Sequence, residues 1–92
     1  MVTAFVLINA KRDKIPETAE ALNALDGVAE VYSVAGQADL IAVIRVKTND
    51  QLAELVTEHM LRLDGIVATE TMIAFRAYSK HDLERLFSIG ME

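Results

Sequence analysis

The chain has 92 residues, 52% of them hydrophobic, and a formal net charge of −5 at pH 7. A chain of this length forms one domain and buries only about 60–65% of its unfolded surface, so a single copy would be marginally stable. The high apolar content therefore predicts that a second subunit covers part of the surface. The negative charge argues against direct nucleic-acid binding, which needs clustered Lys and Arg side chains.

The sequence contains no cysteine, which excludes a disulfide framework, a thiolate nucleophile and a Cys-ligated zinc site. No apolar stretch approaches the roughly 18 residues of a membrane span. The first segment lacks the charged start of a secretory signal. We therefore expect a soluble, cytoplasmic protein.

The first part of the chain predicts a strand, a short helix and a second strand. Residues 2–10 are rich in β-branched and aromatic side chains, as is typical of a strand. Pro16 suits the first turn of a helix and Glu17 favours its positive end, so a helix is expected from about residue 16 to 24. Residues 28–35 follow as a second strand-like run.

The remaining elements are a third strand, a second helix and a fourth strand. Residues 39–47 are strand-like, and Gly36 separates them from the second strand, so a tight hairpin is the expected connection. Thr48 offers a cap for the next helix. Residues 66–75 predict the last strand. Side chains that recur at helical spacing mark the second helix: Leu52, Leu55, Val56, His59, Met60 and Leu63.

The order β-α-β-β-α-β is that of the ferredoxin-like α+β fold, a four-stranded antiparallel sheet with two helices on one face. An internal sequence repeat supports this fold, because LDGVAEVYSV at 25–34 and LDGIVATETM at 63–72 both join the end of a helix to the start of a strand. Asp26 and Asp64 could be read as a carboxylate pair. Each precedes the glycine that turns out of a helix, so turn chemistry is the preferred interpretation.

The strands are apolar on both faces, although two helices can cover only one face of the sheet. AFVLI at 4–8 and LIAVI at 40–44 show no polar alternation. The sequence therefore predicts that the chain dimerises through its sheet with two-fold symmetry, as a dimeric α/β barrel. Residues 1–78 would form this domain, and residues 79–92 a short helical tail against a neighbour or the sheet edge.

The two histidines do not predict catalysis or metal binding. His59 lies in the apolar stripe, where a packed or rim imidazole is expected, and His81 lies in the tail at a solvated helix start. Neither has a second histidine or cysteine at ligand spacing. No glycine-rich phosphate motif occurs. We expect no enzyme activity, no cofactor and no metal, although small dimeric ferredoxin-like monooxygenases and isomerases leave catalysis open.

Two polar clusters interrupt the apolar pattern. Gly36 can adopt positive φ and Ala38 keeps space open, so Asp39 could pair with a ligand ammonium. The alternative is that the glycine makes the hairpin and the aspartate caps it. At the start of the fourth strand, Thr69 and Thr71 point to one face and the residue between them to the other. β-propensity explains those threonines equally well, and the two clusters can meet across an assembly contact.

Two stretches of the sequence, VAGQADLIAVIRVKTNDQLAELV and LDGIVATETMIAF, together resemble the ligand-binding (RAM) domain of the Lrp/AsnC family of amino-acid-responsive regulators. The resemblance covers residues 2 to about 78. It implies sheet-mediated dimers, rings of dimers that are often octamers, and amino-acid effectors bound between dimers. The ligand-binding positions that it implies are Gly36, Gln37, Ala38, Asp39, Val67, Ala68, Thr69, Glu70 and Thr71.

The sequence departs from the family pattern in two ways. The N-terminal helix-turn-helix is missing, so the resemblance is to a stand-alone domain that cannot itself bind DNA. The family often has an aromatic residue where Ala38 stands, which implies a more open pocket. The expected function is an amino-acid sensor or modulator of transcription, acting alone or by co-assembly with full-length regulators. A small oxygenase or isomerase and a purely structural oligomerisation module remain the alternatives.

Overall fold

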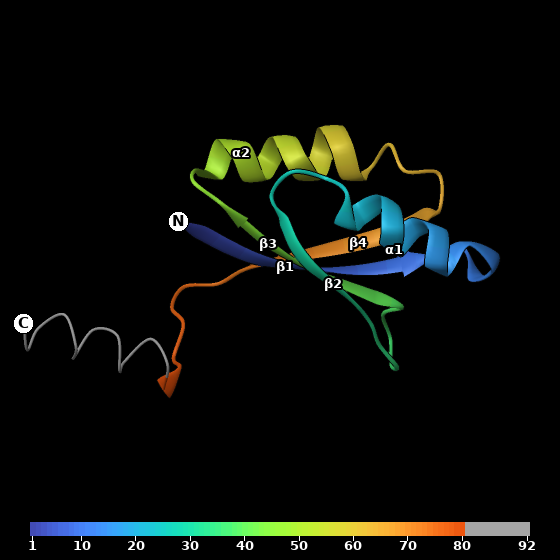
Figure 1. Cartoon of the computed structure of the whole chain (residues 1–92), viewed down its shortest axis with the longest axis horizontal. Coiled ribbons are helices and arrows are strands. Elements are labelled where there is room, and N and C mark those ends of the chain that lie inside the picture. The colour runs from blue at the N-terminus through green and yellow to red at the C-terminus, as the bar shows by residue number, and fades with distance from the viewer. Residues whose placement is uncertain (81–92) are drawn as a thin grey trace, which may run out of the picture.

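The computed structural model describes residues 1–80 and contains one four-stranded sheet and one layer of helices (Figure 1). In chain order, the elements are β1 (Val2–Ala10), the 3-10 turn η1 (Arg12–Lys14), α1 (Ile15–Asn23), β2 (Val28–Ser33), β3 (Leu40–Val46), α2 (Asn49–Glu54), the π-helical turn η2 (Leu55–Met60) and β4 (Ile66–Ile73).

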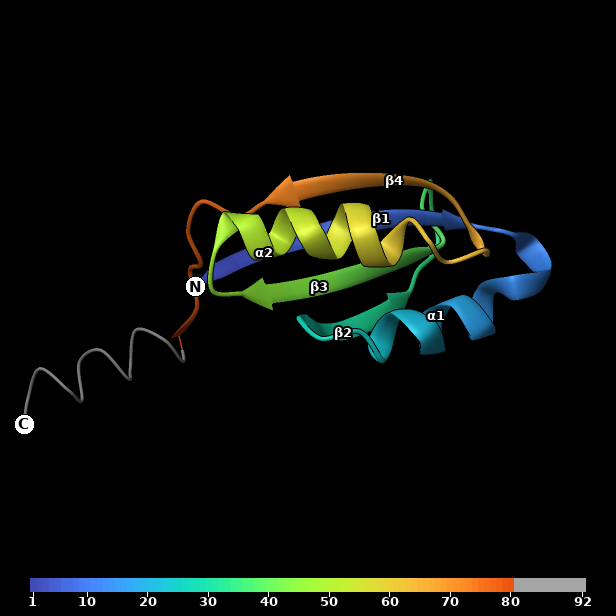
Figure 2. The same cartoon turned by 90° about the horizontal axis from the view of Figure 1, so that it is seen from above.

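The sheet has the order β2-β3-β1-β4, and every neighbouring pair is antiparallel. Both helices lie on the same face, with α1 beside β2 and α2 running over the middle strands (Figure 2). This is the ferredoxin-like arrangement that the sequence predicts. Among residues 1–80, none of the helices is long and apolar enough to cross a membrane.

The core fills the space between the helices and the sheet. Its fully buried large side chains are Val6, Ile8, Leu22, Leu40, Ile44 and Met60. They come from β1, β3 and both helical segments, so all of these elements share one core. Each such side chain contributes about 1.5–3 kcal/mol by leaving water.

Local sequence signals set the helix starts. Pro16 stands in the first turn of α1. Thr48 is the N-cap of α2, and its hydroxyl accepts a hydrogen bond from the Gln51 backbone N–H at 3.1 Å. The Gln51 side chain in turn accepts from the Thr48 N–H at 3.3 Å, which completes a capping box. The cap predicted at Thr48 is therefore confirmed.

Two sequence predictions differ from the structure in detail. The second helix is not α-helical throughout, because its last part is the π-helical turn η2, which has the same apolar residues but a wider turn. The connection between β2 and β3 runs from residue 34 to 39, so it is longer than the expected tight hairpin. The predicted tail, residues 79–92, lies outside the described residues except for its first two.

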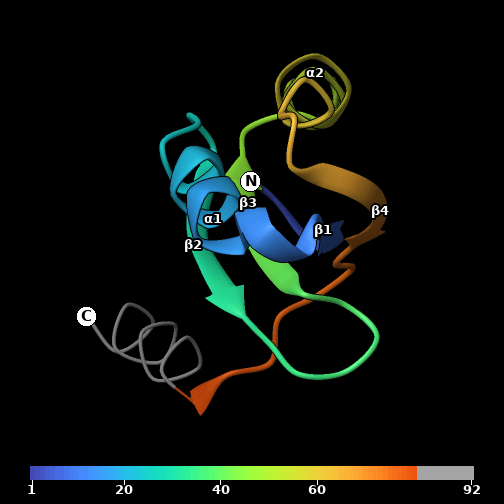
Figure 3. The same ribbon diagram turned by 90° about the vertical axis from the view of Figure 1, so that its right-hand side faces the viewer.

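No helix covers the other face of the sheet, which we call the open face, among the residues that the structure describes (Figure 3). The strand register places Phe5 beside Val43 and Met72, and Leu7 beside Ile41. Met72 is 46% exposed in the single chain. Just past β4, Phe75 is fully exposed and Tyr78 is 85% exposed. The predicted two-sided apolar character of the strands is therefore confirmed.

Candidate functional site

The two predicted ligand-binding segments lie at the same end of the sheet, which we call the hairpin end. Ile8 of β1 pairs with Leu40, next to the hairpin, and on its other side with Thr69 of β4. Because neighbouring strands are about 4.8 Å apart, the two segments are separated by roughly 10 Å across β1. One chain therefore brings them to one edge without placing them in contact.

Asp39 ties the hairpin to the end of β1. Its backbone N–H donates to the Ile8 carbonyl at 2.9 Å, and its carbonyl accepts from the Val34 N–H at 3.0 Å. Its carboxylate Oδ2 accepts a hydrogen bond from the Ala10 N–H at 2.9 Å. The side chain of Asp39 thus bonds to β1, while its backbone carbonyl closes the hairpin. Its second oxygen, Oδ1, accepts no hydrogen bond from any described residue.

Gly36 stands at an open tip of the hairpin. Its φ of +134° lies in the region that favours glycine, as predicted, and a Cβ added there would meet no atom within 4 Å. Gln37 is exposed and Ala38 half-buried. Within residues 1–80, the backbone N–H groups of Gly36, Gln37 and Ala38 donate no hydrogen bond. The hairpin therefore presents unpaired donors beside a half-engaged carboxylate.

The start of β4 presents its side chains to both faces. Thr69 and Thr71 pair with Ile8 and Val6, whose side chains are buried on the helix side, whereas Glu70 pairs with Leu7 on the open face. This confirms the predicted alternation. Val67 and Ala68 precede them and are exposed. The segment is accessible along most of its length.

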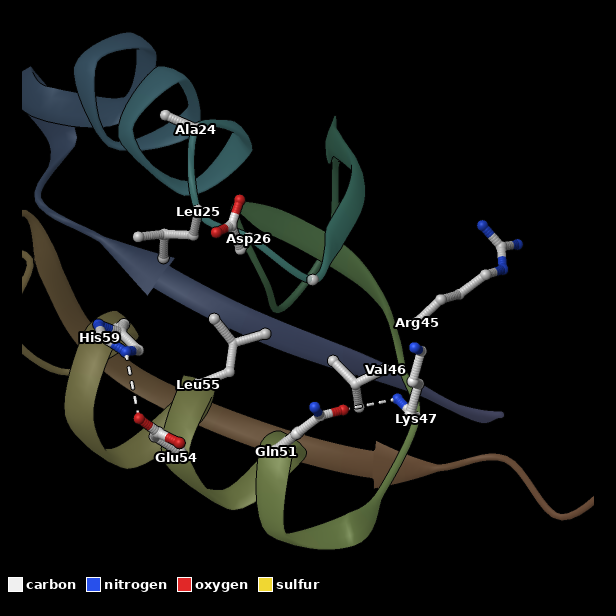
Figure 4. Close-up of a pocket in the computed structure, with 11 residues that line it drawn as sticks. Ala24, Leu25, Asp26, Arg45, Val46, Lys47, Gln51, Glu54, Leu55 and His59 are labelled. Atoms are coloured by element: carbon white, nitrogen blue, oxygen red, sulfur yellow. Dashed lines mark hydrogen bonds and ion pairs between the residues drawn. The ribbon is translucent and has the colours of Figure 1, made fainter.

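A pocket of about 630 Å³ lies at the opposite end of the sheet, between the end of α1 and the second helix (Figure 4). Leu25, Val46 and Leu55 supply its apolar surface, and Gly27 lies among them. None of the predicted ligand-binding residues lines it. Sequence reasoning missed this pocket because its walls come from three elements that no motif connects.

The rim of this pocket carries charged side chains, including Asp26, Lys47, Glu54 and His59. The Nε2 atom of His59 lies 3.9 Å from Oε1 of Glu54. In an α-helix, residues five apart project about 140° away from each other. In η2 the backbone closes i→i+5, which brings them to the same side. His59, predicted as a packed or rim side chain, therefore lies on the rim, 52% exposed.

Asp26 and Asp64 do not form a pair, because their turns stand at opposite ends of the sheet. Asp64 lies 3.6 Å from the Lys11 ammonium, and both groups are exposed. Across residues 1–80, no group of three His, Cys, Asp or Glu side chains is placed to hold a metal ion.

One pKa shift is clear, on the open face. The Tyr32 hydroxyl donates a hydrogen bond to the Glu30 carboxylate. That bond and the negative charge of Glu30 raise the pKa of the Tyr32 phenol above its usual 10.0, because both favour the protonated form. Glu30 also lies 3.7 Å from the Arg45 guanidinium, which turns away from the pocket (Figure 4).

Known proteins with related sequences are transcriptional regulators. An uncharacterised helix-turn-helix-type transcriptional regulator of Pyrococcus furiosus is 34% identical over 76 residues, which are 79% of this chain and 51% of that protein. The helix-turn-helix-type transcriptional regulator FL11 of the same organism is 29% identical over 79 residues, which are 86% of this chain and 52% of that protein. The chain thus spans about half the length of these relatives.

Solved structures show the same fold. A protein of Thermus thermophilus superposes with a TM-score of 0.82 at 46% identity, over 87% of this chain and 100% of its own. AsnC of E. coli gives a TM-score of 0.79 at 25% identity, over 85% of this chain and 53% of its own. A feast or famine regulatory protein of M. tuberculosis, solved in complex with L-methionine, gives a TM-score of 0.68 at 26% identity. The match covers 87% of this chain and 54% of that protein.

The family model described as the Lrp/AsnC ligand binding domain matches residues 3–83, nearly the whole chain. This match agrees with the strand order, with the two helices on one face and with the regulators that the sequence resembles. The chain belongs to the Lrp/AsnC ligand-binding domain family.

Proposed function

We propose that the chain binds a free amino acid and forms oligomers, and that it acts as a sensor or modulator of transcription without binding DNA itself. The observation that carries the proposal is the arrangement at the hairpin end. There, Asp39 has one carboxylate oxygen held by β1 and the other without a partner among the described residues. The relative that was solved with L-methionine supports the class of ligand.

The hairpin end offers both groups that a zwitterion needs. Oδ1 of Asp39 would accept hydrogen bonds from the ligand ammonium. The unpaired N–H groups of Gly36, Gln37 and Ala38 would donate to its carboxylate, as backbone amides do in anion-binding turns. The methyl group of Ala38 leaves room for the ligand side chain. Oδ2 remains bonded to Ala10, so the carboxylate is positioned before the ligand arrives.

The second part of the site, Val67 to Thr71, would come from a neighbouring dimer. Within one chain the two segments are separated by β1, so a single ligand of amino-acid size does not bridge them. A site completed by two dimers would bind the ligand only in the assembled state. Ligand binding would then shift the oligomer equilibrium by its differential affinity, which is the means of regulation.

The dimers themselves would form through the open face. Its apolar row, with Phe5 and Met72, has no cover within residues 1–80, and Phe75 and Tyr78 extend from the same sheet. Two-fold packing of these faces would bury them, and rings of dimers such as octamers would follow. Full-length regulators of the same family are candidate co-assembly partners. A sensor of this kind acts in the cytoplasm and needs neither an enzyme activity nor a cofactor.

Calorimetry with Asp39 variants tests the proposed site. Asp39→Asn keeps an oxygen that can accept from Ala10 but loses the negative charge, so amino-acid affinity should fall at least tenfold, or about 1.4 kcal/mol. Asp39→Ala should abolish binding. Asp64→Asn is the matched control, because it removes an exposed aspartate at the same end of the sheet and should leave affinity unchanged. Unchanged affinity in Asp39→Asn would refute the site.

A further inference from the structure

The residues that follow β4 form an exposed segment, residues 74–80, which we call the arm. The backbone N–H of Ala74 donates to the Thr3 carbonyl at 2.9 Å, so the first residue of the arm is anchored to the sheet. From there the arm leaves on the side of the open face, away from both helices (Figure 1, Figure 3). Phe75 is fully exposed and Tyr78 nearly so, which means that their own sheet covers neither ring.

We propose that the arm of each copy packs on the open face of a second copy, where Arg76 pairs with the partner subunit's Glu70. The two arms then clamp the dimer from both sides. This inference rests on the dimer proposed above, because it names the segment that holds that dimer together. It does not depend on ligand binding at the hairpin end.

The arm is long enough to reach a facing sheet. Two sheets that pack face to face lie about 10 Å apart, and an extended chain advances about 3.3 Å per residue. Residues 75–77 therefore span the gap and bring Tyr78 to the level of the facing sheet. Because the arm already projects from the open face, its direction does not have to reverse on assembly.

The exposed rings match the apolar surface that they cover. Phe5 and Met72 are paired neighbours in the sheet, and both are exposed on the open face. An aromatic side chain buries about 150–250 Å², so the Phe75 and Tyr78 rings of two arms bury roughly 600–1,000 Å². A stable interface buries about 1,200–2,000 Å² in total. The arms thus supply roughly half of the area that a stable dimer needs.

Charge complementarity favours a second copy as the partner of the arm. Residues 74–80 carry two basic side chains and no acidic one, although the chain as a whole has a net charge of −5. On the open face, Glu30 already has a hydrogen bond and an ion pair. Glu70 and Arg76 have no ion pair within the described part of the chain. Two-fold symmetry brings this unpaired carboxylate and guanidinium together twice.

Charge reversal tests the pair and shows which copy the arm contacts. Without ligand, Arg76→Glu and Glu70→Arg each place like charges at both arm contacts of a homodimer. Each should raise the dimer Kd about tenfold in analytical ultracentrifugation, since both symmetric contacts are lost. In an equimolar mixture of the two variants, a heterodimer has opposite charges at both contacts. Native mass spectrometry should therefore find more than half of the dimers as heterodimers.

An arm that folds onto its own sheet gives a different result. Every copy in the mixture then keeps like charges between its own arm and its own face, so heterodimers do not exceed half of the dimers. That outcome overturns the proposal, as does an unchanged dimer Kd in both single variants.

Truncating a ring tests the apolar contact. Phe75→Ala should raise the dimer Kd at least about tenfold, because each dimer loses two rings. The side chain is fully exposed in one copy, so the variant should fold, which circular dichroism checks. Leu61→Ala is the matched control, since it truncates another exposed apolar side chain, in the helix layer, and should leave the Kd unchanged.

Phe5→Ala separates this inference from the dimer on which it rests. If Phe5→Ala raises the dimer Kd but Phe75→Ala does not, the dimer through the open face stands and the arm contact is overturned. If the wild-type chain stays monomeric, both are overturned. If both variants raise the Kd and Leu61→Ala does not, the arm packs on the open face of the partner as proposed.

Discussion

The two Leu-Asp-Gly turns of the chain have the same sequence and stand at opposite ends of the sheet, yet their surroundings differ. In both, the glycine carbonyl accepts a backbone hydrogen bond from the end of a strand, from Arg45 to Gly27 at 2.9 Å and from Lys11 to Gly65 at 2.8 Å. Gly65 is buried against α1, whereas Gly27 lies beside an open pocket. The two turns thus share this backbone hydrogen bond, but φ is positive at Gly27 and not at Gly65, and the packing around the two glycines differs.

The neighbouring helix causes the difference. At Gly65, a Cβ would lie 1.9 Å from Oγ1 of Thr18, so α1 fills the space completely. At Gly27, the nearest atoms are the ends of the Val46 and Leu55 side chains, and the second helix leaves a gap beside them. One end of the helix layer is thus closed by packing, and the other has an open pocket.

The largest effect on stability is expected at the closed end. Gly65→Ala should lower the free energy of unfolding by about 3 kcal/mol, because the new methyl group overlaps the buried Thr18 side chain. Denaturant titration measures this. Adding Thr18→Ala should recover at least about 1 kcal/mol, since it removes the overlapping oxygen. If the losses in free energy of unfolding caused by Gly65→Ala and Thr18→Ala simply add in the double variant, the close packing of α1 against this turn is contradicted.

At the open end, Gly27→Ala should cost about 2 kcal/mol, mainly because its φ of +96° is unfavourable for a residue with a side chain. Gly36→Ala is the matched control. Gly36 also has positive φ, but a Cβ there meets only open space. The cost of Gly27→Ala beyond that of Gly36→Ala measures the contacts with Val46 and Leu55. Equal costs would show that the pocket surface tolerates a methyl group.

A smaller effect is expected from Asp39 in the absence of ligand. Asp39→Ala leaves the Ala10 N–H without its carboxylate partner and should cost about 1 kcal/mol of stability. Asp39→Asn keeps an oxygen acceptor and should cost about 0.5 kcal/mol or less. Thermal unfolding of both variants separates this structural role from ligand binding. A larger loss of stability in Asp39→Asn than in Asp39→Ala would contradict the hydrogen bond between the Ala10 N–H and the Asp39 carboxylate.

The smallest effect concerns the polar chain Tyr32, Glu30 and Arg45, which runs along the open face between the two ends. Glu30→Gln should lower the pKa of Tyr32 toward 10.0, since the carboxylate raises it. The stabilisation from this hydrogen bond is present below pH 10 and is lost as the pH rises through the raised pKa. Ultraviolet titration in a Tyr78→Phe background measures it, and an unchanged curve would show that the bond does not form in solution.

The fold follows from the sequence because its signals are local and redundant. Pro16, Thr48 and the repeated turns mark element boundaries, and the apolar stripes of β1 and the second helix fix which side is buried. The positive φ of Gly36 is predictable for the same local reason.

The sites are harder to predict because they depend on contacts between distant segments. The bond from Ala10 to Asp39 joins β1 to the connection between β2 and β3, and the sequence shows only an aspartate near a turn. The π turn that brings His59 toward Glu54 has the same apolar residues as a regular helix, so the periodicity does not reveal it. A site completed by another subunit leaves even less local signal.

The most direct test of the central claim is a thermal-shift screen of the chain against the twenty amino acids, with oligomer mass measured on the same samples. A ligand at 100 times its Kd stabilises the folded state by about 2.7 kcal/mol. For a domain of this size, that corresponds to a rise in Tm of roughly 10–20 °C. We predict that at least one amino acid raises Tm and shifts the oligomer mass, and that Asp39→Ala removes both effects. If all twenty leave Tm and mass unchanged, the chain is not an amino-acid sensor.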